Sequence, residues 1–95
     1  MQFDWEPAKS EKNLRKHGIS FDDAMEILDP QRPVILEDRD HSEVEDRYYA
    51  IGVSSKGRLL TVCITYRGTT VRIISARKAT KREMDIYADE IHKRS

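Results

Sequence analysis

The chain has 95 residues, of which 38% are hydrophobic and 36% are charged. This length suits one compact domain, so we expect residues 1–95 to form a single domain. The 17 basic and 17 acidic side chains balance to zero, which excludes a protein drawn to nucleic acid by its overall field. A single cysteine, Cys63, excludes an intramolecular disulfide, and no apolar run is long enough to cross a membrane. We therefore expect a cytoplasmic protein whose contacts with RNA, if any, use a local basic patch.

The N-terminal part is predicted to be a strand followed by two helices. Residues 1–5 have the pattern of a short strand, and Pro7 suits the first turn of the next helix, where its missing N–H is not needed. Gly18 favours the left-handed conformation that ends helices, so this helix is expected to end at His17. Ser20 then caps a second helix. Its apolar face consists of Phe21, Ala24, Met25 and Leu28.

The middle of the chain has the patterns of strands. Residues 34–36 form a short apolar strand, whereas 37–46 are too polar to bury and are interpreted as a loop. The strands that follow form an antiparallel meander, with predicted ranges 47–53, 60–66 and 71–77.

The last predicted element is a helix that opens with a capping box. The Thr80 hydroxyl and the Glu83 carboxylate satisfy the first backbone N–H groups reciprocally, which gives Glu83 a structural explanation. An apolar stripe on this helix is expected to pack on the sheet or on a partner, and consists of Met84, Tyr87, Ala88 and Ile91. The order β-α-α-β-β-β-β-α predicts an α+β fold, a small antiparallel sheet with helices on one side and the other face open.

Motifs for several kinds of chemistry are missing from the sequence. The histidines are far apart and have no neighbours at metal-ligand spacing, so we expect no metal; they are His17, His41 and His92. The glycines form no phosphate-binding loop, and there is no nucleophile elbow. We therefore expect no cofactor.

Arginines and tyrosines concentrate on or beside the strands. They are Arg47, Tyr48, Tyr49, Tyr66, Arg67, Arg72 and Arg77. Arginine offers a planar fork for phosphate, and tyrosine supplies a ring for stacking and a hydroxyl. Each arginine is equally well explained as a side chain that flanks a strand and keeps its head in water. Ideal alternation places Arg72 and Arg77 on opposite faces, so both line one flat site only if the strand twists or ends.

The first helix presents a basic polar face. Positions three and four apart are neighbours on a helix, which brings together Lys9, Asn13, Lys16 and His17. An imidazole suits acid or base catalysis, although at a helix end His17 is more simply explained by donation to terminal carbonyls. The acidic stretch 37–46 repels phosphate, so we expect it to lie away from bound RNA.

Several stretches, in their order and spacing, resemble the BrnT family of bacterial toxins. They are FDWEPAK at 3–9 with Asn13, KHGISF at 16–21 with Ala24, the strand 47–52, and RIISARKAT at 72–80 with Glu83 and Tyr87. The resemblance runs nearly from end to end of the chain, and the last stretch is its most specific part.

The resemblance implies a RelE-like fold, a ribonuclease activity that arrests growth, and neutralisation by a BrnA-type antitoxin. Such metal-independent ribonucleases let the ribose 2′-OH attack the adjacent phosphate, so the protein positions RNA and stabilises developing negative charge. The catalytic residues that it implies are Arg72 and Arg77, for phosphate stabilisation, and His17 and Tyr66, for proton transfer. For RNA binding it implies Lys16 and Arg47, to which the basic helix face adds Lys9 and Asn13.

A non-enzymatic module that binds RNA or a protein is the alternative, and the zero net charge keeps it open. A basic patch on a neutral protein favours an antitoxin that is acidic or that covers the site. The chain has no DNA-binding pattern of its own, so we expect DNA contact only through the antitoxin, in a hetero-oligomer.

Overall fold

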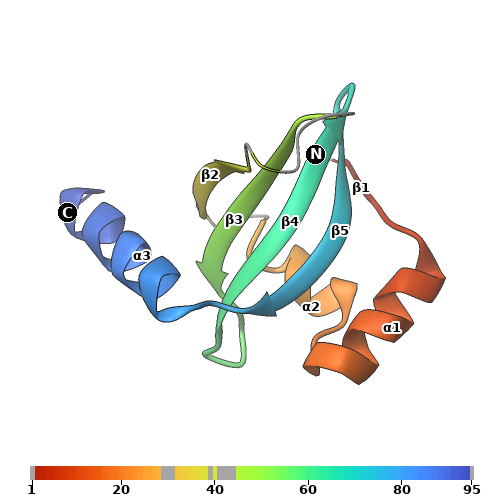
Figure 1. Cartoon of the computed structure of the whole chain (residues 1–95), viewed down its shortest axis with the longest axis horizontal. Coiled ribbons are helices and arrows are strands. Elements are labelled where there is room, and N and C mark those ends of the chain that lie inside the picture. Colours follow the sequence, from red (N-terminus) through yellow and green to blue (C-terminus); the bar gives the residue numbers. More distant parts are fainter. Residues whose placement is uncertain (1, 29–31, 39, 41–44, 95) are drawn as a thin grey trace.

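The structure is a computed structural model that describes residues 2–28, 32–38, 40 and 45–94. In this part of the chain the elements follow the predicted order (Figure 1). They are β1 (Gln2–Asp4), α1 (Pro7–His17), α2 (Phe21–Met25), β2 (Val34–Asp38), β3 (Arg47–Val53), β4 (Leu59–Arg67), β5 (Thr70–Lys78) and α3 (Lys81–Arg94). The α+β class is confirmed.

The described strands form one sheet in the order β1-β5-β4-β3-β2. The pairs from β2 to β5 are antiparallel, as predicted for the meander. The pair of β1 with β5 is parallel, so the expectation of a purely antiparallel sheet is wrong at this edge. The reason is the connection through α1 and α2, which takes the chain to the far edge of the sheet before the meander returns it to β1.

The turn between the first two helices is built as the sequence indicates. Gly18 has a φ of 73°, and its N–H donates to the carbonyl of Leu14 over 2.8 Å. The hydroxyl of Ser20 accepts the N–H of Asp23 over 3.1 Å, which caps α2. The α2 helix ends at Met25, earlier than the apolar spacing predicted, and the chain continues as turns to Leu28.

A buried asparagine attaches α1 to the edge of β5. β1 ends opposite Arg72, so the edge of β5 beyond that point has no strand beside it. The Asn13 amide takes the place of a strand there, because it donates to the carbonyl of Ala76 over 2.8 Å and accepts its N–H over 3.1 Å. It also donates to the carbonyl of Ile19 over 2.8 Å. These three bonds fix the position of α1 relative to the sheet.

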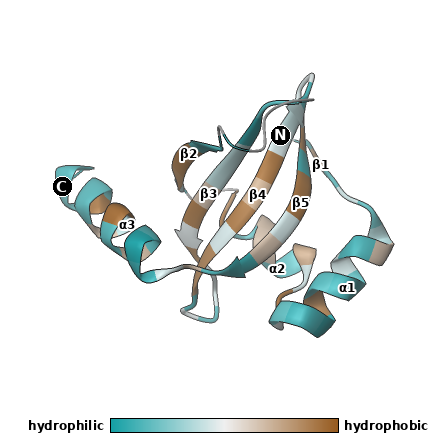
Figure 2. Ribbon diagram, viewed as in Figure 1, coloured by the Kyte–Doolittle hydropathy of each residue, from teal (hydrophilic) through white to brown (hydrophobic). Residues whose placement is uncertain are grey.

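The hydrophobic core lies between the sheet and the first two helices. Its buried members come from α2 and the residues around it and from the inner face of the sheet, and include Ile19, Phe21, Ile27, Leu60, Val62, Ile64 and Ile73. Figure 2 shows apolar segments along β3, β4 and β5, whereas α1 and α3 are largely hydrophilic. The inner face of the sheet is therefore covered by closely packed apolar side chains.

The last helix does not share that face. α3 extends away from the sheet (Figure 1), and none of its residues is buried. The predicted stripe does not pack on the sheet, because the side chains of Met84 and Ile91 are exposed and that of Tyr87 is only half-buried. Glu83 and Ile86 face the sheet instead, on the side opposite α2, so the face that was expected to be open carries the start of α3.

Candidate functional site

A β-bulge brings Arg72 and Arg77 to the same face of the sheet. Residues paired across two strands share a face, and Arg72 pairs with Thr65 while Arg77 pairs with Thr61. The two threonines are four residues apart on β4 and therefore point the same way. The register shifts at Cys63 and Ile64, which pair with Ser75 and Ile73 and leave Ile74 as the extra residue. The shift reverses the alternation of side chains along β5, so Arg72 and Arg77 lie on one face of the sheet together with Arg47, and we call this side the arginine face.

The Arg77 guanidinium is held by a carboxylate from α3. It donates to both Glu83 carboxylate oxygens, over 2.7 and 3.0 Å, and more weakly to the carbonyl of Lys78 over 3.3 Å. The Tyr49 ring lies on the same guanidinium, with 5.7 Å between the ring centroid and Cζ. These bonds use three of the five N–H groups of an arginine, so two remain for a ligand.

Glu83 joins the helix cap to the sheet face. Its carboxylate accepts the N–H of Thr80 over 2.8 Å, and the Thr80 hydroxyl accepts the N–H of Glu83, which confirms the capping box. The same carboxylate accepts the hydroxyl of Thr61 over 2.9 Å. Burial by itself raises the pKa of Glu83, but the bonds from Arg77, Thr80 and Thr61 outweigh it and lower the pKa from 4.5 to about 2. Glu83 is therefore ionised at neutral pH and holds Arg77 in one orientation.

Further polar residues continue this cluster toward β2. The Tyr49 hydroxyl donates to the Asp38 carboxylate, and burial together with that negative charge raises the pKa of Tyr49. Glu37 and Asp38 belong to strand β2, and Asp38 is buried opposite Arg47. The prediction that residues 37–46 form a loop is therefore wrong for both, and the prediction that they are too polar to bury is wrong for Asp38. Burial is also the main reason that the pKa of Cys63 is raised, which makes this thiol a poor nucleophile.

Arg72 occupies the other end of the same face. It forms an ion pair with Asp4 of β1, its register partner on that side. The partners of Arg72 and Arg77 are four positions apart on β4, which corresponds to about 13 Å along the strand. The two arginines therefore face the same side of the sheet, but they lie too far apart to bind one phosphate together.

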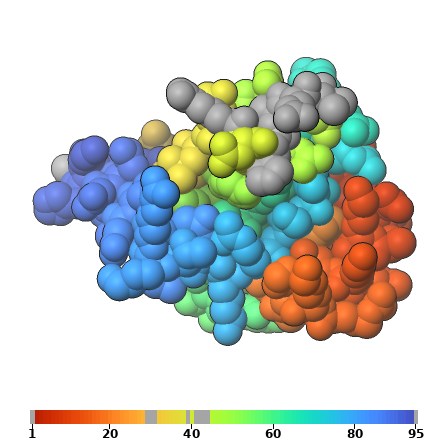
Figure 3. Space-filling view, viewed as in Figure 1, coloured from red at the N-terminus to blue at the C-terminus, as the bar shows by residue number. Residues whose placement is uncertain are grey.

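The basic face of α1 borders this surface. A groove of about 180 Å³ between α1 and the bulged part of β5 is lined by Lys9, Lys12, Asn13, Lys16, His17, Ile74 and Ser75. Lys9, Lys16 and His17, which the sequence suggested as site residues, all line this groove. Asn13 is different: it is 7% exposed and its amide is bonded to backbone, which gives it a structural role. Figure 3 shows α1 and β5 forming a continuous surface on one side of the molecule.

The remaining two predicted residues lie on different faces. Arg47 is half-buried on the arginine face, where its charge acts on Cys63 and opposes the effect of burial on that thiol. Tyr66 pairs with Val71 on the opposite face and packs edge-to-face on Tyr48, with 5.4 Å between the ring centroids. The fold thus separates Tyr66 from Arg72 and Arg77.

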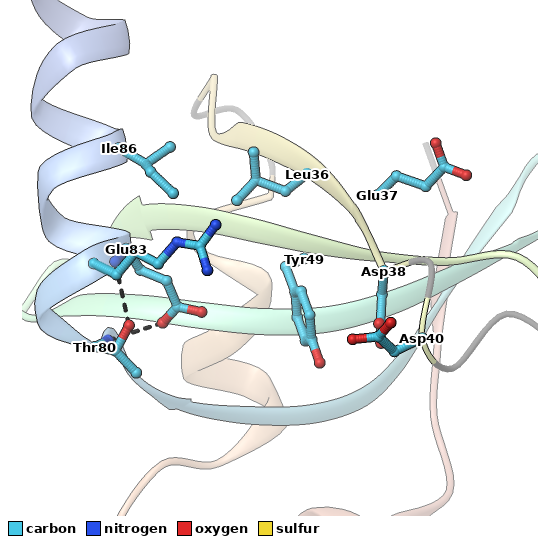
Figure 4. A pocket seen from close by; sticks show the side chains of 9 residues that line it. Leu36, Glu37, Asp38, Asp40, Tyr49, Thr80, Glu83 and Ile86 are labelled. Atoms are coloured by element: carbon cyan, nitrogen blue, oxygen red, sulfur yellow. Dashed lines mark hydrogen bonds between the residues drawn. The ribbon is translucent and has the colours of Figure 1, made fainter.

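A pocket of about 430 Å³ opens between α3 and β2 (Figure 4). Its lining residues are Leu36, Glu37, Asp38, Asp40, Tyr49, Thr80, Arg82, Glu83 and Ile86. Among the described residues, no three His, Cys, Asp or Glu side chains are grouped so as to hold a metal ion. His41, one of the histidines considered in the sequence, lies outside the described residues. None of the described helices is long and apolar enough to span a membrane.

Sequence reasoning missed three parts of this site. It assigned Glu83 only to the helix cap, because its contact with Arg77 crosses from a strand to a helix and has no periodic spacing. It left Tyr49 unassigned among the aromatic residues and Asp38 within a loop. The apolar 34–36 run followed by the 47–53 strand was the available signal, since an antiparallel pair of these strands extended by two residues brings Asp38 opposite Arg47.

Comparisons with known proteins agree with this architecture. The model of the family described as "Ribonuclease toxin, BrnT, of type II toxin-antitoxin system" matches residues 5–83. The 1.1 Å crystal structure of the Brucella abortus ribonuclease toxin BrnT superposes with a TM-score of 0.67 and 25% sequence identity, covering 85% of this chain and 99% of that chain. No curated protein sequence matches. Since the family model spans most of the chain, the protein belongs to the BrnT family of ribonuclease toxins of type II toxin–antitoxin systems.

Proposed function

We propose that this protein is a metal-independent endoribonuclease whose active surface is the face that carries Arg77. In this reaction the ribose 2′-OH gives up its proton and attacks the adjacent phosphate, while the bond from phosphorus to the 5′-oxygen of the next nucleotide breaks and that oxygen takes up a proton. The product end is a 2′,3′-cyclic phosphate, and the phosphate gains negative charge in the transition state. The observation that carries the proposal is the orientation of Arg77, whose guanidinium is held by Glu83 and Tyr49 with two N–H groups remaining. A guanidinium fixed before the substrate arrives stabilises that charge without a reorganisation cost.

The basic groove supports a path for the RNA backbone. Lys9, Lys12 and Lys16 line it at helical spacing, and the opposite wall is formed by Ile74 and Ser75 of β5. Ser75 lies two residues before Arg77 on the same face, since their partners Cys63 and Thr61 alternate on β4. An RNA strand that follows the lysines along α1 therefore reaches Arg77 over the edge of the sheet, and the lysines neutralise its phosphates.

The remaining predicted residues receive unequal roles in this proposal. His17 lies in the groove and is the candidate for proton transfer. Arg72 and Arg47 face the same side as Arg77 and contribute to phosphate binding. Tyr66 is left out because it lies on the opposite face.

The positions of the arginine face and the groove also explain how an antitoxin would neutralise the toxin. A BrnA-type antitoxin that covers the arginine face excludes RNA, and the groove lysines attract acidic segments of that partner. We propose that the two proteins form a hetero-oligomer in the cytoplasm and that any DNA contact belongs to the antitoxin. Release of the free toxin then leads to RNA cleavage and growth arrest.

The test is cleavage of a defined RNA by the partner-free protein in the presence of EDTA, with product ends mapped on a sequencing gel. We expect Arg77→Ala to lower the rate by about 10² or more, and Lys16→Ala mainly to weaken RNA binding. Lys78→Ala is the matched control for the arginine, because Lys78 pairs with Leu60 and points to the other face. Arg15→Ala is the control for Lys16, since Arg15 is exposed on α1 but does not line the groove.

Two outcomes count against the proposal. If folded Arg77→Ala protein cleaves as fast as wild type, the catalytic assignment is wrong. If wild-type protein leaves RNA intact and its induction does not arrest growth, the non-enzymatic interaction module is the better description.

A further inference from the structure

The pocket between α3 and β2 adjoins the proposed phosphate site. Two of its lining residues, Tyr49 and Glu83, are also the residues that contact the Arg77 guanidinium. Its volume of about 430 Å³ lies within the range of roughly 300–1,000 Å³ that is usual for small-molecule sites. A group bound in this pocket would therefore lie next to a phosphate held by Arg77.

The walls of the pocket suit a flat ring. Figure 4 shows Leu36 of β2 and Ile86 of α3 extending toward each other along one side, with the Tyr49 ring between them and the acidic end. Apolar and aromatic side chains of this kind stack on the bases of single-stranded RNA. Ile86 lies beyond residue 83, where the family match ends, so this wall belongs to a part of the chain that the family description does not cover.

The polar groups at one end of the pocket are hydrogen-bond acceptors. Asp38 and Asp40 lie at the same end, beside the Tyr49 hydroxyl (Figure 4). Asp38 is buried and accepts the Tyr49 hydroxyl, whereas Asp40 is exposed to an incoming ligand. An ionised carboxylate accepts hydrogen bonds and donates none, and its two oxygens match a pair of adjacent N–H donors.

Only one RNA base presents such a pair. Guanine has N1–H and N2–H side by side on its Watson–Crick edge, whereas adenine and cytosine have one donor beside an acceptor and uracil has one donor between two acceptors. We propose that this pocket is a base-specificity site that takes guanine from the nucleotide next to the phosphate at Arg77, with Asp40 reading the N1–H and N2–H donors. The cleavage part of this inference rests on the proposed ribonuclease function.

The acidic end of the pocket is consistent with RNA binding in this arrangement. Carboxylates repel phosphate, which is why the sequence predicted that residues 37–46 avoid RNA. In the proposed complex the two kinds of charge contact different parts of the nucleotide. The phosphate lies at Arg77, and the carboxylates face the uncharged base. Phosphate contacts position a nucleic acid and base-edge contacts specify it, so the two groups have separate tasks.

Nucleotide binding tests the pocket without any cleavage. We expect guanosine 3′-monophosphate to bind the full chain at least about tenfold more tightly than adenosine 3′-monophosphate in isothermal titration calorimetry, the size of effect that a bidentate base contact produces. Asp40→Asn replaces one acceptor oxygen by an N–H₂ donor and should reduce this preference to less than about threefold. Asp85→Asn is the matched control, because Asp85 is an exposed carboxylate of α3 that does not line the pocket.

Cleavage of a defined RNA tests the same site in the reaction. We expect cleavage beside guanosine, a loss of about tenfold when that guanosine is replaced by inosine, which lacks the N2 amino group, and no such loss in the Asp40→Asn protein. Selective binding of guanosine 3′-monophosphate, with neither RNA cleavage nor growth arrest on induction, would refute the ribonuclease proposal and leave the pocket assignment intact. Cleavage without base preference, together with equal binding of the two nucleotides, would overturn the pocket assignment alone. Binding of an oligolysine peptide that depends on Asp40, without selectivity for guanine, would also overturn it and assign the pocket to a protein partner.

Discussion

The two faces of the sheet bury their residues by different means. The inner face is covered by α2 and its neighbours, and its buried side chains are apolar, as with Phe21 and Leu60. On the outer face Thr61 and Thr65 are buried just as deeply, but their cross-strand neighbours are Arg77 and Arg72. Long polar side chains, together with the start of α3, cover this face. The comparison shows that one face of the sheet carries the apolar core and the other carries charged side chains, and the charged face is the one proposed to bind RNA.

The largest effect is expected on the inner face. Phe21 is fully buried and packs edge-to-face on Trp5, with 6.3 Å between the ring centroids. Phe21→Ala should lower the free energy of unfolding by about 3–5 kcal/mol, measured by urea denaturation. If that variant does not fold, Phe21→Leu should cost less and remain measurable. Met84→Ala, an exposed apolar position, should cost less than about 0.5 kcal/mol, and equal costs at both positions would contradict the comparison.

The second largest loss of stability is expected for a substitution of Asn13, which lies at the edge of the sheet. Asn13→Ala leaves the N–H and carbonyl of Ala76 and the carbonyl of Ile19 without their partner, which should cost about 2–3 kcal/mol. Hydrogen exchange at the Ala76 amide should speed up more than exchange at amides of β4. Lys12→Ala, on the adjacent exposed position of α1, serves as the control. Unchanged exchange at Ala76 would show that Asn13 does not hold the helix to β5.

The third effect tests the polar network of the outer face through its pH dependence. The folded-state pKa of Glu83 is lowered from 4.5 to about 2, so its contribution is present above pH 4.5 and is lost as the pH falls toward 2. Glu83→Gln should therefore cost about 1–2 kcal/mol at pH 7, and the difference from wild type should shrink across that acid window. Glu90→Gln, whose carboxylate has a surface pair with Lys93 at 3.6 Å, should show little change. A Glu83→Gln cost that is constant between pH 7 and pH 3 would refute the role of the ionised carboxylate.

The smallest effect is expected at Tyr66, a catalytic candidate from the sequence that lies on the face opposite Arg77. Tyr66→Phe removes a hydroxyl from a side chain that is 48% exposed, and should change both the unfolding free energy and the RNA cleavage rate only slightly, by less than about 0.5 kcal/mol. A large loss of cleavage in this variant would mean that RNA contacts both faces.

Much of the fold follows from local signals in the sequence. Gly18, Ser20 and the Thr80–Glu83 capping box determine where helices end or begin, and the structure has these features as predicted. The alternating strands from 47 to 77 likewise become a meander, because their contacts are between neighbours in sequence. The parallel pairing of β1 was not predictable in this way, since its partner Thr70 is far along the chain and a three-residue strand has little pattern of its own.

The candidate site, like the fold, has one part that local sequence signals predict and one part that they do not. The amino-acid sequence identifies the available side chains, which are the arginines of β5 and the lysines of α1, and their order identifies the family. Which of these side chains face each other depends on how the strands and helices pack. The extra residue Ile74 in β5 turned Arg72 and Arg77 to one face, and the start of α3 brought Glu83 onto Arg77 and Ile86 opposite Leu36. The physical reason is that a bulge and a helix docking across strands depend on non-local register, which no periodicity within a single segment specifies.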